Sequence, residues 1–134
     1  MMVRREVQGV IFDEVDNAKT VLIIKKTDYS ARCYRWRLLK GGLHDGEAET
    51  EGLKREILEE TGLKKIRILE RVFTYEYFFR SVRHTVSSYL VKADSKEPIK
   101  LQKSEVSGYL WTTKQEALRM LHWNNEKDAL ECLG

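Results

Sequence analysis

Acidic side chains crowd one short stretch of this chain. Residues 41–63 read GGLHDGEAETEGLKREILEETGL. If residues 50–61 form a helix, Glu56 and Glu60 are i,i+4 neighbours and Glu59 follows Glu56 by one turn, so all three carboxylates project toward one side. Like charges this close repel each other, and a bound divalent cation turns the repulsion into attraction. The stretch therefore predicts a site for a hard metal ion such as Mg²⁺, which prefers carboxylate oxygens.

The residues around these carboxylates also suit a metal-binding turn. Gly41 lets the backbone approach a ligand closely, and Gly62 is typical of a helix C-terminal cap. Arg55 lies one residue before Glu56 and four before Glu59, so its guanidinium can hold a glutamate in position. An acidic run is more often a solvated helix face. Such a face, however, needs neither the two glycines nor the arginine.

The spacing resembles the signature of the Nudix hydrolase family, GX5EX7REUXEEXGU, in which U is an aliphatic residue. Every specified position is filled, by Gly41, Glu47, Arg55, Glu56, Ile57, Glu59, Glu60, Gly62 and Leu63. A match at so many positions is far more specific than a lone glycine motif. The resemblance implies Mg²⁺ as cofactor, for which Mn²⁺ can substitute. Its implied ligands are the carboxylates of Glu56, Glu59 and Glu60 and the Gly41 carbonyl.

The resemblance also implies a reaction, the hydrolysis of a phosphoanhydride bond in a nucleoside polyphosphate. The cations neutralise the polyphosphate and lower the pKa of a bound water. A carboxylate then removes a proton from that water, which attacks phosphorus. Glu59 and Glu105 are the two candidates for this base, and the sequence leaves the choice open; Glu105 is alternatively a further metal ligand. Arg55 completes the implied catalytic set.

Residues outside the signature bear on the substrate. The run WRLLKG resembles the WxFPKG element of diadenosine tetraphosphate hydrolases, with Leu39 in place of the usual proline. Glu105, Tyr109 and Trp111 reproduce the E-x-x-x-Y-x-W spacing of the same enzymes. The resemblance covers about residues 7–130, and it favours diadenosine tetraphosphate, split into ATP and AMP. The implied substrate-binding residues are Trp36, Lys40, Tyr77, His84 and Tyr109.

Two kinds of contact are expected from this set. Tyr77 can stack on a nucleobase, or it can be a hairpin side chain that covers the core. Lys40 and His84 are the candidates for phosphate contact, because Lys40 adjoins a glycine turn and His84 is expected in a basic hairpin turn with Arg80 and Arg83. His84 can also be a simple surface histidine.

Charge is distributed unevenly along the chain. Residues 25–40 hold six basic side chains and a single acidic one, whereas residues 45–60 hold seven acidic ones. We interpret the first segment as a basic loop that leads into the acidic helix. Basic side chains there would meet phosphates that the metal ions leave uncovered, although any single one of them can equally be an ordinary exposed residue.

Length and composition indicate one globular domain. The 134 residues, of which 42% are hydrophobic and 34% charged, suffice for a single domain over residues 1–134. No apolar run reaches the length of a membrane span, and the charged start MMVRREVQ is unlike a secretory signal. We therefore expect a cytoplasmic protein without a membrane partner, whose Cys33 and Cys132 are reduced, buried thiols. Nothing in the sequence indicates an oligomeric state.

Hydrophobic periodicity predicts a mixture of strands and helices. Strands are expected at 3–12, 20–24, 66–79, 85–91 and 108–111, with 66–79 and 85–91 forming a hairpin. A second helix follows a cap at Thr112 or Thr113, and Asn124 either ends it or starts a last helical piece through Leu130. These elements predict an α/β (α+β) fold. With the family resemblance, we expect a Nudix-type α/β/α sandwich, in which helices flank a central mixed sheet.

Three other functions stay open at this stage. A nucleoside triphosphate pyrophosphohydrolase shares the signature. An RNA 5′-end pyrophosphohydrolase fits the WxxxKG element, but the chain has no extended basic stripe with interleaved aromatics, so nucleic acid is expected as a partner only through such a 5′ end. A non-catalytic module that senses nucleotides is the third, although the retained glutamates disfavour it.

Overall fold

A mixed β-sheet forms the middle of the molecule. The computed structural model describes residues 2–28, 31–102 and 106–134. Within those residues the sheet has seven strands, and three helices accompany it. The strands are β1 (Met2–Val15), β2 (Ala18–Asp28), β3 (Cys33–Arg37), β4 (Leu39–Gly42), β5 (Ile66–Phe79), β6 (Val82–Ala93) and β7 (Val106–Thr112). The helices are α1 (Glu49–Thr61), α2 (Lys114–Met120) and α3 (Asn124–Glu131).

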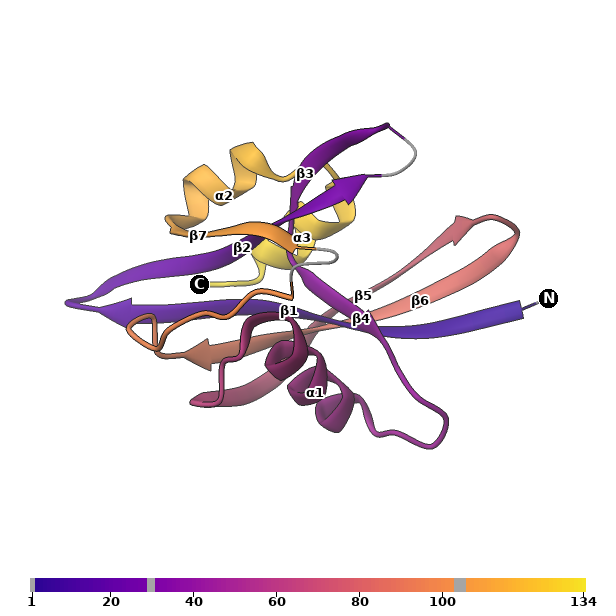
Figure 1. The fold of residues 1–134 in the computed structure, drawn as a ribbon, viewed down its shortest axis with the longest axis horizontal. Coiled ribbons are helices and arrows are strands. Elements are labelled where there is room, and N and C mark those ends of the chain that lie inside the picture. Colours follow the sequence, from indigo (N-terminus) through magenta and orange to yellow (C-terminus); the bar gives the residue numbers. More distant parts are fainter. Residues whose placement is uncertain (1, 29–30, 103–105) are drawn as a thin grey trace.

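Alternating side chains give the sheet two apolar faces. In β2, Leu22 packs into one core with Leu53 of α1, while the neighbouring Ile23 packs into a second core with Ala117 of α2 and Leu130 of α3. Figure 1 shows α1 on one side of the sheet and α2 with α3 on the other. The predicted α/β/α sandwich is therefore confirmed.

The sheet opens between its first two strands. β1 pairs with β2 from Phe12–Val21 to Val15–Ala18 and runs parallel to β6 on its other edge. Beyond that pairing β1 and β2 no longer pair with each other. There β3 pairs with β2, and β4 pairs with β1, with Gly41 opposite Val7. The segment 33–42 thus enters the sheet between β1 and β2 (Figure 1).

The predicted basic loop is wrong for most of its length. Lys25 and Lys26 lie in β2, Arg35 and Arg37 in β3, and Lys40 in β4. Short strands rich in charge have little periodic signal of their own, and here they are stabilised by backbone pairing with β1 and β2. The basic side chains are consequently held at fixed positions on a sheet.

The β5–β6 hairpin turn is shorter than expected. Arg80 and Ser81 alone connect the strands, with φ of 51° and 63°, as a tight hairpin turn requires. Arg83 and His84 therefore lie in β6 and not in the turn. His84 is only 8% exposed, so it is not a surface histidine.

Helix α1 has the predicted position and cap. Gly62 has φ of 75° and its N–H donates to the Leu58 carbonyl at 2.9 Å. Gly52 lies inside the helix because it packs closely on the preceding loop: a Cβ there would lie 2.3 Å from Leu43 Cδ2 and 2.9 Å from Glu47 Oε1. The helix thus sits directly on the loop that leads into it.

Two shorter helices follow β7. The Thr113 hydroxyl accepts a hydrogen bond from the Glu116 N–H at 3.1 Å, which confirms Thr113 as the cap of α2. Helix α3 begins at Asn124, as one of the two predicted options stated. In the described ranges no helix is long and apolar enough to cross a membrane.

The cysteine prediction is wrong in one respect. Cys33 and Cys132 are both free thiols, but both are exposed and not buried. Cys33 begins β3, and Cys132 follows the last residue of α3. Neither position belongs to one of the two cores.

Candidate active site

Arg55 connects helix α1 to the loop before it. Its Nε and Nη2 donate to the two oxygens of Glu47 at 2.8 and 2.9 Å, and Nη2 also donates to the Gly42 carbonyl at 2.9 Å. Its Nη1 lies 3.0 Å from Glu56 Oε1 and 3.3 Å from Glu59 Oε2. The bidentate pair with Arg55 lowers the pKa of Glu47 to about 2 and raises that of Arg55. The guanidinium therefore fixes both the loop and the helix carboxylates.

Glu56 rests directly on the backbone of Gly41. A Cβ at position 41 would lie 2.1 Å from Glu56 Cδ and 2.4 Å from Oε2. A side chain fits there only if Glu56 moves, which explains the glycine by contact rather than by torsion. Burial raises the pKa of Glu56, against the opposing effect of Arg55. The carboxylate is thus held between the β4 backbone and the arginine.

The other two signature glutamates diverge. Glu60 is 3% exposed, and Lys26 Nζ of β2 lies 3.3 Å from its Oε1. The Glu59 side chain is 51% exposed and turns to Arg55 on the helix surface. Glu56 and Glu59 do lie together, because both contact Arg55 Nη1, but successive helical residues are about 100° apart, so Glu60 faces the sheet and Glu59 faces outward. Among the residues that the structure describes, no group of three or more acidic, histidine or cysteine side chains could hold a metal ion.

The oxygen donors nevertheless suit a divalent cation. Glu56 and Glu60 lie one helical turn apart, and each is already paired with a positive group, Arg55 or Lys26. Carboxylate oxygens with a nearby backbone carbonyl are the ligand types that Mg²⁺ prefers. The missing side chain at Gly41 lets the Glu56 carboxylate lie directly against this backbone. The other predicted ligand or base, Glu105, lies outside the described residues.

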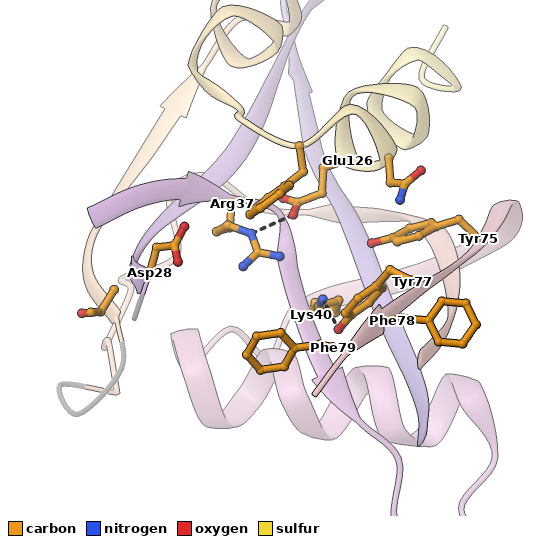
Figure 2. A pocket seen from close by; sticks show the side chains of 11 residues that line it. Asp28, Arg37, Lys40, Tyr75, Tyr77, Phe78, Phe79 and Glu126 are labelled. Atoms are coloured by element: carbon orange, nitrogen blue, oxygen red, sulfur yellow. Dashed lines mark hydrogen bonds and ion pairs between the residues drawn. The ribbon is translucent and has the colours of Figure 1, made fainter. Parts of the chain in front are cut away.

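A cavity of about 400 Å³ opens on the face of the sheet opposite α1. Its aromatic wall comes from β5, where Tyr75, Tyr77 and Phe79 alternate along the strand and Phe78 adds a further ring. The rest of the lining is mostly polar and is formed by Thr27, Asp28, Arg37, Lys40, Trp123, Asn125 and Glu126. Figure 2 shows Arg37 next to Glu126 of α3, and Lys40 beside the Tyr77 ring. A cavity of this size, with aromatic walls and a few cations, suits a nucleoside with phosphate.

A buried ion pair forms one side of this cavity. Arg37 Nε donates to Glu126 Oε2 at 2.7 Å, and the Leu38 N–H donates to Glu126 Oε1 at 2.8 Å. Glu126 is 1% exposed. Both carboxylate oxygens are therefore satisfied, and α3 is joined to the point where β3 passes into β4.

A second polar cluster lies at the Tyr77 end. The Tyr77 hydroxyl donates to Glu6 Oε1 at 2.6 Å and accepts from Lys40 Nζ at 2.8 Å. Its ring stacks on His84, with centroids 4.5 Å apart and planes 9° apart, and His84 Nδ1 lies 3.1 Å from Glu6 Oε1. Burial lowers the pKa of Lys40 to about 8, although Glu6 opposes this change. Glu6 thus orients the three side chains around it.

The structure groups some of the predicted substrate residues and separates others. Lys40 and Tyr77 line the cavity, and His84 adjoins it through the stack. Trp36 instead packs against the core under α2 and α3 and bridges to Leu121. Tyr109 is 45% exposed on β7, the strand that pairs with β2, and does not line the cavity. Trp36 and Tyr109, which were expected to bind substrate because their spacing in the sequence resembles that of the family, therefore do not line this cavity.

Several residues that line the cavity were not predicted from the sequence. The aromatics at positions 73, 75, 77 and 79 alternate, which is a signal for one strand face that includes Tyr75 and Phe79. Arg37 and Glu126 are joined across 89 residues of sequence, and Glu6 meets Tyr77 across 71. No local sequence pattern predicts such pairs.

Comparison with known proteins places this geometry in a family. The family model for the NUDIX domain matches residues 2–132. The Ap4A hydrolase of C. elegans, solved as a binary complex, is 20% identical with a TM-score of 0.83, over 96% of this chain and 93% of that one. A NUDIX hydrolase described as putative, from Listeria monocytogenes, is 25% identical with a TM-score of 0.75, over 96% and 90%.

A third similar structure was solved with a bound ligand. The NUDIX domain of Shewanella oneidensis NrtR, complexed with ADP ribose, is 18% identical with a TM-score of 0.79, over 98% of this chain and 86% of that one. Among curated proteins, none matches this chain significantly. The match of the domain model across nearly the whole sequence, together with the shared fold, shows that the chain belongs to the Nudix family.

Proposed function

We propose that this protein hydrolyses a phosphoanhydride bond in a nucleoside polyphosphate with Mg²⁺ as cofactor, and that diadenosine tetraphosphate, split into ATP and AMP, is its preferred substrate. One observation carries the proposal: consecutive residues of β4 adjoin the aromatic cavity and the carboxylate of Glu56. Lys40 lines the aromatic cavity, while Gly41 receives the Glu56 carboxylate. The cavity and the carboxylates of α1 therefore adjoin the same strand from its two faces, and we infer that the polyphosphate runs from the cavity past β4 to those carboxylates.

The cavity supports a nucleotide over other polyanions. Aromatic rings stack on any nucleobase, and such stacking is worth roughly 1 to 3 kcal/mol per base. Lys40 and Arg37 add positive charge among the rings. The preference for a dinucleotide rests on the WRLLKG element and on the likeness of the fold to a protein named Ap4A hydrolase.

Each signature residue has a role in this proposal. Glu56 and Glu60 hold the cation, and Arg55 positions the carboxylates through the contacts described above. When bound, the cation neutralises polyphosphate charge and acidifies water. Glu59 is exposed enough to meet a water molecule, and it removes the proton from the attacking water unless Glu105 does so.

Product identification tests this proposal. Purified protein is incubated with Mg²⁺ and, separately, with diadenosine polyphosphates, deoxynucleoside triphosphates, ADP-ribose and 5′-triphosphorylated RNA. ATP plus AMP from diadenosine tetraphosphate is the expected result. A stronger preference for a mononucleotide, ADP-ribose or RNA refutes the substrate assignment, and a lack of product from every compound favours a nucleotide-sensing module.

A variant pair tests the metal assignment. Glu56→Gln should lower kcat/KM by at least about a hundredfold, because it removes a charged ligand and the partner of Arg55. Glu51→Gln is the matched control, since Glu51 lies exposed in the first turn of the same helix. Equal activity of the two variants, with equal melting temperatures, would rule out the role of Glu56.

A further inference from the structure

A second cavity lies beyond the hairpin end of the first one. Its volume is about 580 Å³, and it is formed by the start of β1, the loop 43–46 and the β5–β6 turn. Arg4, Arg5 and Arg80 line it together with His84. The proposed function makes no use of this cavity.

Two of the arginines are held in place. Arg4 packs on Gly42, where a Cβ would lie 2.6 Å from Arg4 Nη2 and 3.0 Å from Nε. Its Nε is also 3.7 Å from Glu6 Oε2. Arg80 lies over the ring of Phe79, with Cζ 5.0 Å from the centroid. These guanidinium groups are therefore positioned and still accessible, since the Arg4 side chain is 59% exposed.

The charge in this cavity is positive on balance. Asp45 is the one carboxylate in its lining, against three arginines. Arg5 is partly satisfied by Glu49 of α1, at 3.8 Å. Arg4 is similarly close to Glu6, but more than half of each side chain is exposed, so both can still meet an anion together with Arg80. Arginine is well suited to bidentate contact with phosphate.

The two cavities are neighbours. Phe79 lines both of them, and His84 of the second stacks on Tyr77 of the first. On β4, the residue that contacts Arg4 directly follows the residue that contacts Glu56. A polyphosphate that leaves the aromatic cavity along β4 can therefore extend toward Arg4 and Arg80.

From this arrangement we propose that the second cavity is a distal phosphate subsite, which binds the part of the polyphosphate chain beyond the bond that is broken. It selects long polyphosphates over short ones by adding arginine contacts that a short chain does not reach. The inference rests on the proposed function for the direction of the chain, but the anion site itself can be measured separately.

Binding of inorganic tripolyphosphate measures the anion site without catalysis. Titration calorimetry is done in EDTA, so that neither metal nor nucleobase contributes. The wild-type protein should bind, and Arg80→Gln and Arg4→Gln should each weaken binding by about fivefold or more. Arg119→Gln, at an exposed position of α2, is the matched control and should bind as the wild type does. Equal affinity in all four proteins, or no binding by the wild type, overturns the subsite.

Hydrolysis separates this inference from the proposed function. With diadenosine tetraphosphate, Arg80→Gln should raise KM by about fivefold or more and leave kcat unchanged, because the contact lies away from the reacting phosphorus. Unchanged KM in an active protein overturns the subsite and leaves the proposed function intact. Tripolyphosphate binding that depends on Arg80, in a wild-type protein that does not hydrolyse the dinucleotide, supports the subsite and refutes the proposed function.

Discussion

The contact between Gly41 and Glu56 gives the sharpest test of the site. In Gly41→Ala, the new methyl group would lie 2.1 Å from Glu56 Cδ and 2.4 Å from Cγ. Ordinary carbon contacts are about 3.5 to 4.0 Å. The β4 backbone is paired with β1, so the glutamate must move instead, by more than about 1 Å. That movement carries its carboxylate away from the backbone and from Arg55.

The expected loss follows from that displacement. A misplacement of about 1 Å in a catalytic group costs on the order of a hundredfold in rate, or about 2.7 kcal/mol. We expect kcat/KM for diadenosine tetraphosphate to fall by at least about that factor, while overpacking lowers the free energy of unfolding by about 1 to 3 kcal/mol. Initial rates with Mg²⁺ and thermal unfolding measure the two effects.

Two controls make the result specific. Gly108→Ala is the same substitution in β7, where the nearest atoms are those of Lys25, at 3.8 and 3.9 Å, and its activity should stay within about threefold of the wild type. On a Glu56→Ala background, Gly41→Ala should cost little further activity, because the clashing group is gone. Similar activity in Gly41→Ala and Gly108→Ala, or full additivity in the double variant, would refute the reasoning.

Three further predictions concern binding and stability. Tyr77→Ala should raise KM about tenfold or more through lost stacking, whereas Tyr77→Phe keeps the ring and should lose less; equal KM values for the two would exclude stacking. Arg37→Met leaves the buried Glu126 without its 2.7 Å partner and should lower the free energy of unfolding in urea by about 3 kcal/mol, and a loss below about 1 kcal/mol would contradict this. Burial alone would raise the pKa of Asp13, but hydrogen bonds, foremost that from Lys92 at 2.5 Å, lower it below its ordinary 3.8. Because the pKa of Asp13 is lower in the folded state, its stabilising contribution is present above pH 3.8 and is lost as the pH falls through the folded value. Asp13→Asn should therefore lower the free energy of unfolding in urea by about 1 to 3 kcal/mol at pH 7, and by progressively less below pH 4. A loss that does not depend on pH would contradict the assignment.

Local patterns in the sequence were enough for the elements that carry their own signal. Helix α1 was expected at 50–61 and is found at Glu49–Thr61, because its apolar spacing and the Gly62 cap are local features. The strand expected at 66–79 has those bounds in β5. Strands β3 and β4 were missed, since short charged strands depend on pairing with distant chain segments.

The candidate site also contains some residues that local sequence predicts and others that only the folded chain brings together. The signature identified Arg55 and the glutamates of α1, because they are neighbours on one helix. It did not show which of these carboxylates is buried, because the burial of Glu60 depends on the packing of the helix on the sheet and on Lys26 of β2. The cavity depends on pairs such as Arg37 with Glu126, which only the folded chain brings together.

The position of β4 has an evolutionary consequence. Its alternate residues serve opposite faces of the sheet, so Lys40 and Gly42 belong to the substrate side, whereas Gly41 belongs to the side of α1. Substitutions in β5 and α3 can therefore change which molecule is bound without moving the carboxylates of α1. A fold divided in this way can keep one reaction while its substrate range diversifies, and selection can act on the two faces almost independently.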